Sequence, residues 1–161
     1  MPFQGRIKTS KADHYNTPLE GWSDIMQFIP KETKIWCPFY NDGTAKKILK
    51  ELEYNNVYHE NEDFFTYYLD DHICIDNPPF SIKDKIIGTL YEKKKPFSLL
   101  LPFDTLERKY LFKYQEGLQI VIPKNRYKYT ANANNNPPFK SVWLCWNFQK
   151  YLGNKELIFL D

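Results

Sequence analysis

The stretch from His72 to Glu92, "HICIDNPPFSIKDKIIGTLYE", decides the fold. It begins with a short apolar run, passes through a rigid Asn-Pro-Pro-Phe segment and continues with apolar residues at helical spacing, namely Ile82, Ile86, Ile87 and Leu90. Ser81 and Asp84 are spaced like a capping pair at the start of that helix. A strand, a short loop and a helix in this order form the unit from which a helix-covered parallel sheet is built.

The same alternation continues on both sides of this stretch. Apolar runs predict strands at 33–39, 56–60, 72–76, 96–103, 117–123, 140–148 and 156–161. Helical spacing predicts helices at 17–29, 44–54, 81–95 and 104–115, with a helical turn in 62–71. Pro18 suits the first helix start, and Asp104 and Glu107 suit caps of the last helix. The pattern predicts an α/β fold whose mostly parallel sheet has helices on both faces and an antiparallel C-terminal edge.

Composition limits the number of domains and the classes of partner. A chain of 161 residues with 42% hydrophobic and 17% aromatic residues can bury one core. We expect a flexible arm over residues 1–16 and a single catalytic domain over 17–161, without a separate target-recognition domain. The net charge of +2 gives weak support for a nucleic-acid partner, so local basic clusters must decide.

Cysteine and histidine usage bears on redox compartment and metals. The three cysteines and three histidines share no disulfide or metal-ligand spacing; they are Cys37, Cys74, Cys145, His14, His59 and His72. We therefore expect reduced thiols and no metal. The N-terminal segment lacks an apolar signal core and no apolar run approaches membrane-spanning length, so the expectation is a soluble cytoplasmic protein with no membrane partner.

Asn-Pro-Pro-Phe occurs twice, in "DNPPFS" (76–81) and in "NNPPFK" (135–140). The first copy stands between a predicted strand and a predicted helix, at the carboxyl end of the strand, where α/β sheets bind ligands. The second copy follows a polar tract and precedes a strand, so we interpret it as a stiff loop. The first copy is the candidate for chemistry.

The first copy has the groups that methylation of an aromatic amine needs. The exocyclic nitrogen of adenine is a poor nucleophile because its lone pair is delocalised into the ring. Asn77 offers a side-chain carbonyl, and Pro78 offers a backbone carbonyl on a stiff loop, so two acceptors can draw on the amine hydrogens. Phe80 offers a flat face for a base taken out of its stack.

On these motifs the chain resembles the class I S-adenosylmethionine-dependent amino-methyltransferases, most closely the adenine-specific (N6) DNA methyltransferases. "NTP" (16–18) looks like the N-terminal cofactor motif, "IWCPFYNDGTAKKIL" (35–49) like the strand-to-helix cofactor loop and "ICIDNPPF" (73–80) like the catalytic motif. The resemblance implies a Rossmann-like class I methyltransferase fold, S-adenosylmethionine as cofactor and the catalytic residues Asn77, Pro78, Pro79 and Phe80. It also implies cofactor-binding residues, namely Thr17, Pro18, Pro38, Phe39, Asn41, Gly43, Glu60, Asp63 and Phe64.

Several of these residues have plainer interpretations. Gly43 lets the backbone approach a ligand, whereas Asn41 stands where the family often has glycine, although Asn is the ordinary residue best suited to a left-handed conformation. Glu60 suits the ribose hydroxyls but equally suits a solvated charge. Phe64 is a core aromatic as readily as a ring beside the cofactor adenine. Thr17 and Pro18 could equally be no more than the start signal of a helix.

Basic and aromatic residues alternate in "PKNRYKYTANANNNPPFK" (123–140). Basic residues can contact phosphates and aromatic residues can stack on bases, so we expect this segment to bind the substrate. The candidate residues are Lys124, Arg126, Tyr127, Lys128 and Lys140, and the alternative is a solvated charged loop. Because a bare catalytic domain has little surface for reading base edges, a partner protein or a homo-oligomer could supply specificity.

The expected function is methyl transfer from S-adenosylmethionine to the amino group of adenine in DNA. An RNA adenine and a protein glutamine present a similarly delocalised amine and remain alternative targets. A catalytically silent methyltransferase-like module that binds nucleic acid is the alternative from a different class.

Overall fold

The computed structural model describes residues 16–129 and 139–161, so the expected arm lies almost wholly outside the described residues. The strands are β1 (Ile35–Trp36), β2 (Val57–Tyr58), β3 (Ile73–Asp76), β4 (Phe97–Pro102), β5 (Leu118–Ile122), β6 (Ser141–Trp146) and β7 (Leu157–Phe159). The α-helices are α2 (Leu19–Met26), α3 (Thr44–Glu51), α4 (Lys83–Glu92) and α5 (Gln149–Leu152). Three 3₁₀ segments accompany them: η2 (Phe80–Ile82), η3 (Phe103–Glu107) and η4 (Lys109–Tyr114).

The strands form one seven-stranded sheet in the order β2-β1-β3-β4-β6-β5-β7. Strands β2, β1, β3 and β4 pair in parallel, β6 is antiparallel to both of its neighbours, and β7 is parallel to β5. The α/β class and the mostly parallel sheet are therefore confirmed. The reversed strand, however, lies inside the sheet, and the C-terminal edge strand β7 runs parallel to its neighbour.

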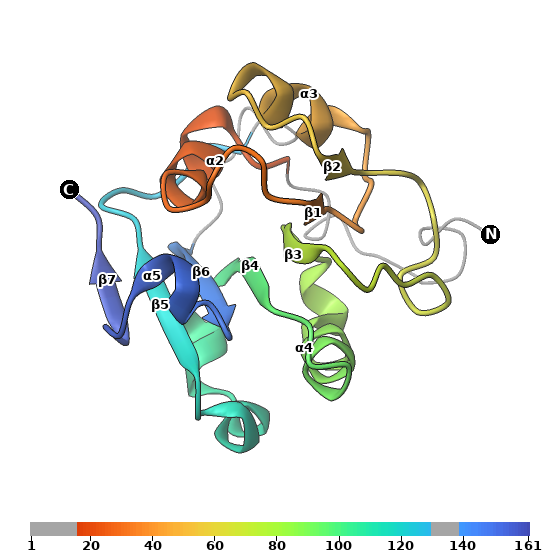
Figure 1. The fold of residues 1–161 in the computed structure, drawn as a ribbon. Coiled ribbons are helices and arrows are strands. Elements are labelled where there is room, and N and C mark those ends of the chain that lie inside the picture. The colour runs from red at the N-terminus through yellow and green to blue at the C-terminus, as the bar shows by residue number, and fades with distance from the viewer. Residues whose placement is uncertain (1–15, 130–138) are drawn as a thin grey trace.

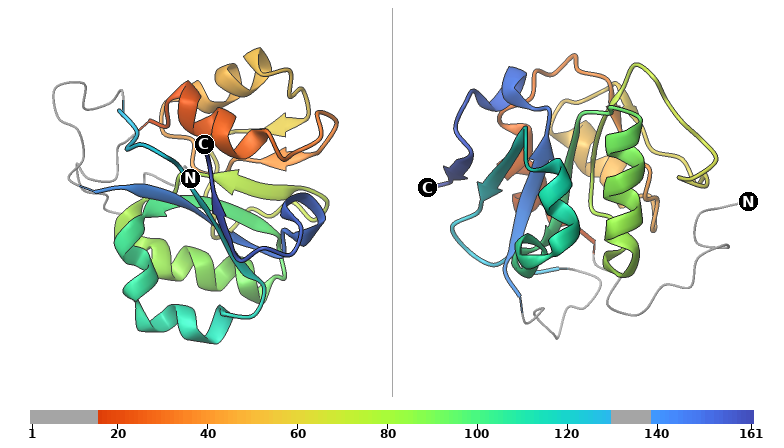
Figure 2. Two further views of the ribbon diagram at one scale, coloured as in Figure 1. Left: turned by 90° about the vertical axis from the view of Figure 1, so that its left-hand side faces the viewer. Right: turned by 90° about the horizontal axis from the view of Figure 1, so that it is seen from below.

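Alternate residues of each strand pack on opposite faces of the sheet. Ile35 and Ile75 belong to the cluster that also contains Trp22 of α2 and Leu49 of α3. Their neighbours in sequence belong to a second cluster, with residues of α4 and η4. Figure 1 shows α2 and α3 on one side of the sheet and α4 on the other, and the left view of Figure 2 shows the sheet between these two layers. Helices thus cover both faces, as the sequence predicts.

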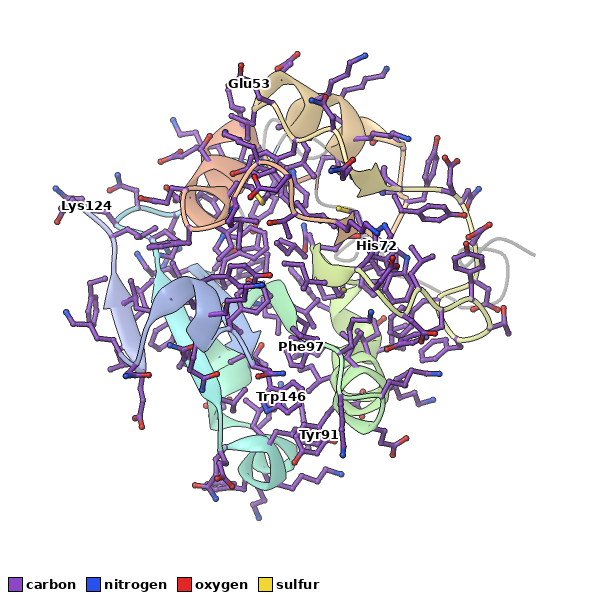
Figure 3. The ribbon with its side chains drawn as sticks, in the orientation of Figure 1. Glu53, His72, Tyr91, Phe97, Lys124 and Trp146 are labelled. Carbon is purple, nitrogen blue, oxygen red and sulfur yellow. The ribbon has the colours of Figure 1, made fainter. Side chains whose placement is uncertain are left out.

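Aromatic packing fastens α4 to the antiparallel part of the sheet. The ring of Trp146 on β6 lies edge-on to Tyr91 of α4 at 4.9 Å and stacks with Phe97 of β4 at 6.2 Å between centroids. Figure 3 shows these three side chains gathered between α4 and the β4–β6 pair. The contact fixes the position of the helix that follows the catalytic candidate loop.

The prediction of one helix over 104–115 is wrong. Residue Arg108 is extended, with φ −75° and ψ 129°, and separates η3 from η4. Leu111 and Tyr114, three residues apart, are the buried side chains of η4, and this spacing matches a 3₁₀ turn.

The other helices are shorter than predicted, and α5 was not predicted. Helix α4 starts after the 3₁₀ turn η2 with Ile82 at its N-cap, so Ser81 does not occupy the capping position. Its predicted last turn is absent because Lys94 adopts a left-handed φ of 53°. Within residues 16–129 and 139–161, no helix has the length and apolar character to cross a bilayer.

Candidate functional site

The predicted cofactor and catalytic residues follow three neighbouring strands. Strands β2, β1 and β3 are adjacent and parallel, so the loops after them emerge at one edge of the sheet. The loop after β1 is 37–43, the segment after β2 is 59–67, and the loop after β3 carries Asn77 to Phe80. The fold therefore brings together sequence segments whose residues lie up to 43 positions apart.

The side chain of Asp76, the last residue of β3, joins two of these loops. Its Oδ2 accepts the backbone N–H of Phe39 at 2.7 Å, and its Oδ1 accepts the backbone N–H of Asn77 at 2.8 Å. Asp76 is 3% exposed. One carboxyl group thus holds the candidate cofactor loop beside the candidate catalytic loop.

Burial dominates the electrostatics of Asp76. It raises the pKa of the carboxyl to about 8, although the two N–H bonds act in the opposite direction. Burial also raises the pKa of the neighbouring Cys37 thiol and lowers the pKa of His59. The site therefore favours neutral forms of all three groups.

Cys37, His59 and Asp76 place possible metal-ligand atoms within 4.8 Å of one another. Sequence spacing did not reveal this cluster, because each residue stands at the carboxyl end of a different strand. The thiol of Cys37 donates to the carbonyl of Ile75 at 3.1 Å, and His59 Nδ1 lies 2.8 Å from the Cys37 carbonyl. Both oxygens of Asp76 accept backbone N–H groups. We interpret the cluster as an internal hydrogen-bonding network through these backbone bonds, whereas His59 Nε2 is buried and has no hydrogen-bond partner among the described residues.

The loop after β1 turns through two left-handed residues. Asn41 has φ 52° and Gly43 has φ 81°. A Cβ at Gly43 would lie 2.6 Å from the hydroxyl of Tyr40, so a side chain at this position would require the Tyr40 ring to move. Asn41 takes the conformation for which glycine is the usual residue, as its side-chain type allows.

The "NTP" segment lies against this loop. Asn16 Nδ2 donates to Asp42 Oδ2 at 2.8 Å, and Asn41 Nδ2 donates to Asn16 Oδ1. Pro18 is the N-cap of α2, which confirms the predicted helix start. The hydroxyl of Thr17 is buried and has no hydrogen-bond partner among the described residues. A buried polar atom beside a left-handed loop suits a polar ligand.

The segment after β2 contributes less clearly. Glu60 is exposed and lies 3.9 Å from Lys46, as a solvated surface pair would. Phe64 is 4% exposed, stacks on Trp36 at 5.7 Å and packs against Phe39 at 5.1 Å, so its ring belongs to the core. Asp63 is buried and accepts the backbone N–H of Phe65 at 3.0 Å, which fixes the local turn. Of the three predicted cofactor residues in this segment, Glu60 is exposed whereas Asp63 and Phe64 are buried.

The catalytic candidate loop is rigid and partly shielded. Pro78 and Pro79 are buried, and Asn77 and Phe80 are half-buried. The Oδ1 atom of Asn77 is itself shielded from solvent. The ring of Phe80 meets that of Phe139 edge to face at 5.5 Å and 77°. Phe139 is the phenylalanine of the second Asn-Pro-Pro-Phe copy, whose residues 135–138 lie outside the described residues. The phenylalanines of the two copies are therefore in contact with each other.

The basic segment divides into exposed and buried members. Lys124, Arg126 and Lys128 are exposed, and Figure 3 shows Lys124 at the outer margin of the molecule. Tyr127 is 2% exposed and donates its hydroxyl to Asp24 of α2 at 2.5 Å, so its ring has no free face for a base. Lys140 donates to the carbonyl of Lys124 at 3.0 Å, which links the two ends of the segment.

Several residues of this site have roles that were not predicted. Asp76, Phe139, Asn16 and Asp42 all stand inside the quoted segments, but none of the four had an assigned role. Comparison of the chain with protein-family models, with curated proteins and with solved structures found no match.

Proposed function

We propose that this chain is an S-adenosylmethionine-dependent methyltransferase with a Rossmann-like fold, and that its target is the amino group of adenine in DNA. The observation that carries the proposal is the pair of hydrogen bonds from Phe39 and Asn77 to Asp76. A ligand bound by the loop after β1 would lie beside a base bound at the loop after β3. Methyl transfer between two substrates needs this adjacency.

The cofactor would be held by the loop 38–43 and by the Asn16–Pro18 segment bonded to it. S-adenosylmethionine would supply an electrophilic methyl group. The left-handed backbone at Asn41 and Gly43 and the buried hydroxyl of Thr17 suit the polar amino-acid part of the cofactor. Glu60, with its accessible carboxylate after β2, suits the ribose hydroxyls.

The loop 77–80 would bind and activate the target amine. The backbone carbonyl of Pro78 and the side-chain carbonyl of Asn77, once it turns out of its shielded position, would accept the two hydrogens of the amine. These bonds favour a more tetrahedral nitrogen with an available lone pair. Two consecutive prolines keep these acceptors in place at little reorganisation cost. Phe80 would stack on the base, and a strong general base is unnecessary because the alkylated nitrogen sheds a proton readily.

A nucleic acid is favoured over a protein substrate because the exposed cations Lys124, Arg126 and Lys128 follow β5 close in sequence to Phe139, which contacts Phe80. The choice of DNA rests on the resemblance of the motif around Asn77. Incubation with labelled cofactor and, in parallel, duplex DNA, single-stranded DNA, RNA and protein, followed by mass analysis of nucleosides and peptides, tests the substrate class. We expect labelled N6-methyl-2′-deoxyadenosine from the DNA samples. Label in RNA or in glutamine alone would reassign the target, and cofactor binding without transfer to any of them would contradict an enzymatic role.

A further inference from the structure

The C-terminal strand β7 presents an apolar face at an open edge of the sheet. It is the outermost strand of the described sheet and pairs with β5 alone, as Figure 1 shows at the end of the sheet near the C-terminus. Leu157 is 51% exposed and Phe159 is 71% exposed. Their neighbours Ile158 and Leu160 turn the other way and pack on the core cluster that contains α2. An exposed apolar edge of this kind is a template for another strand.

The backbone groups of Leu157 and Phe159 face away from β5. The carbonyl of Glu156 accepts from Ile120 at 2.8 Å, and the N–H of Leu160 donates to Ile122 at 2.9 Å. Since backbone groups alternate sides along a strand, residues 156, 158 and 160 are directed at β5. Leu157 and Phe159 therefore direct their N–H and C=O groups to the open edge.

We propose that β7 pairs with β7 of a second copy of this chain, antiparallel, about a two-fold axis through Ile158. In this register Leu157 lies opposite Phe159 of the partner, and both residues have the outward backbone groups that a hydrogen-bonded antiparallel pair requires. The flanking residues then match by charge, because Lys155 lies opposite Asp161. Leu157 and Phe159 lie on the exposed face of β7, and Lys155 and Asp161 are exposed residues that flank the strand on its two sides.

Neighbouring registers lose this match. An axis through Leu157 places Lys155 opposite Phe159, and an axis through Phe159 places Leu157 opposite Asp161. A two-fold axis that passes between two residues would place a residue with outward backbone groups opposite one whose groups face β5, so no hydrogen-bonded pair could form. The segment from Lys155 to Asp161 is thus complementary to itself in one register, which identifies a second copy as the partner.

The dimer would leave the candidate functional site of each chain open. Strands β4, β6 and β5 separate β3 from β7, so the new interface lies at the opposite end of the sheet from the loops after β1 and β2. A strand pair of this length buries less area than a standard interface, so the association should be weak and concentration-dependent. Methyl transfer per chain should not depend on it, and the two proposals can therefore fail separately.

Sedimentation of the full chain over a range of concentrations tests the inference. We expect a monomer–dimer equilibrium whose dissociation constant rises about tenfold in Lys155→Glu and in Asp161→Lys, and returns to the starting value in the double variant. Phe159→Lys should abolish the dimer. Phe112→Lys is the matched control, because Phe112 is 68% exposed on η4, and it should leave the equilibrium unchanged.

A monomer at the highest soluble concentration would overturn the proposal. An equal loss of dimer in Phe112→Lys, or no recovery in the double charge reversal, would overturn the β7 register. Circular dichroism melting identifies any variant that fails to fold. If Phe159→Lys is such a variant, the charge reversals at the exposed residues Lys155 and Asp161 test the register instead.

Discussion

The carboxyl group of Asp76 accepts the backbone N–H of Phe39 at 2.7 Å, across two loops that leave neighbouring strands. The same group holds the N–H of Asn77, the first residue of the catalytic candidate loop. Because Asp76 is 3% exposed, water cannot easily replace these bonds. The relative position of the two loops therefore depends on one side chain.

Replacement of Asp76 by alanine should destabilise the fold and weaken cofactor binding. Two backbone N–H groups would lose their acceptor, at about 1–3 kcal/mol each where they stay buried, so we expect the free energy of unfolding to fall by roughly 2–6 kcal/mol. Urea denaturation and calorimetry with S-adenosylmethionine measure the two effects. Asp71→Ala is the control, since Asp71 is a surface residue paired with Lys34, and it should change neither quantity appreciably. Unchanged stability in Asp76→Ala would contradict the role given to this carboxyl.

Stability should also depend on pH through Asp76. Burial raises the pKa of this carboxyl from 3.8 to about 8, so the folded protein holds a proton that the unfolded chain releases in this interval. The stabilising contribution is complete below about pH 4 and is lost as pH rises towards 8, at up to about 1.4 kcal/mol per pH unit. Urea denaturation of wild type and Asp76→Asn at several pH values isolates this contribution by difference. Identical pH profiles would show that Asp76 titrates normally.

The loop after β1 should tolerate glycine at Asn41 and reject alanine at Gly43. Gly43→Ala combines a φ of 81° with a Cβ only 2.6 Å from the Tyr40 hydroxyl, and we expect a loss of at least about 1–2 kcal/mol in unfolding free energy. Asn41→Gly keeps the left-handed conformation and loses only the bond to Asn16. Thermal melting compares the two variants. Equal melting temperatures for Gly43→Ala and wild type would contradict the strained conformation described at this position.

Phe139 should position the ring of Phe80. An edge-to-face pair is worth about 0.5–1.5 kcal/mol, so Phe139→Leu should lower kcat/KM on DNA by up to about tenfold while the fold is retained. Phe139→Tyr should preserve the contact and the activity. Phe112→Leu, a substitution of an exposed ring on η4, serves as the control. An equal loss in the tyrosine and leucine variants would indicate that the ring contact is not the cause.

Local patterns predict the elements of this protein better than they predict its contacts. The strand and helix around Asn77 follow from an apolar run and from helical spacing, and the loop position follows from their order. The double role of Asp76 could not be predicted, because its partner Phe39 is 37 positions away and the bond uses a backbone N–H. Tyr127 was misleading for a similar reason. An aromatic residue between basic residues looks accessible, but its ring is buried in the core cluster that contains Trp22, and its hydroxyl bonds to the distant Asp24.

The same limit explains the incorrect helix over 104–115. Helical spacing of apolar residues does not distinguish an α-helix from two 3₁₀ turns when the buried residues are few, as Leu111 and Tyr114 are in η4. The sheet order also needed the structure. Sequence order suggests that β6 follows β5 at the edge, whereas β6 pairs with β4 and β5 on its two sides.

Methyl transfer by wild type and by Asn77→Ala, with Phe112→Ala as a control, is the decisive measurement for the loop after β3. We expect labelled N6-methyladenine from the wild type and the control, and a loss of at least about 100-fold in kcat for Asn77→Ala with cofactor binding retained. Equal labelling of adenine by the wild type and Asn77→Ala would contradict the assignment of the loop after β3 as the catalytic loop.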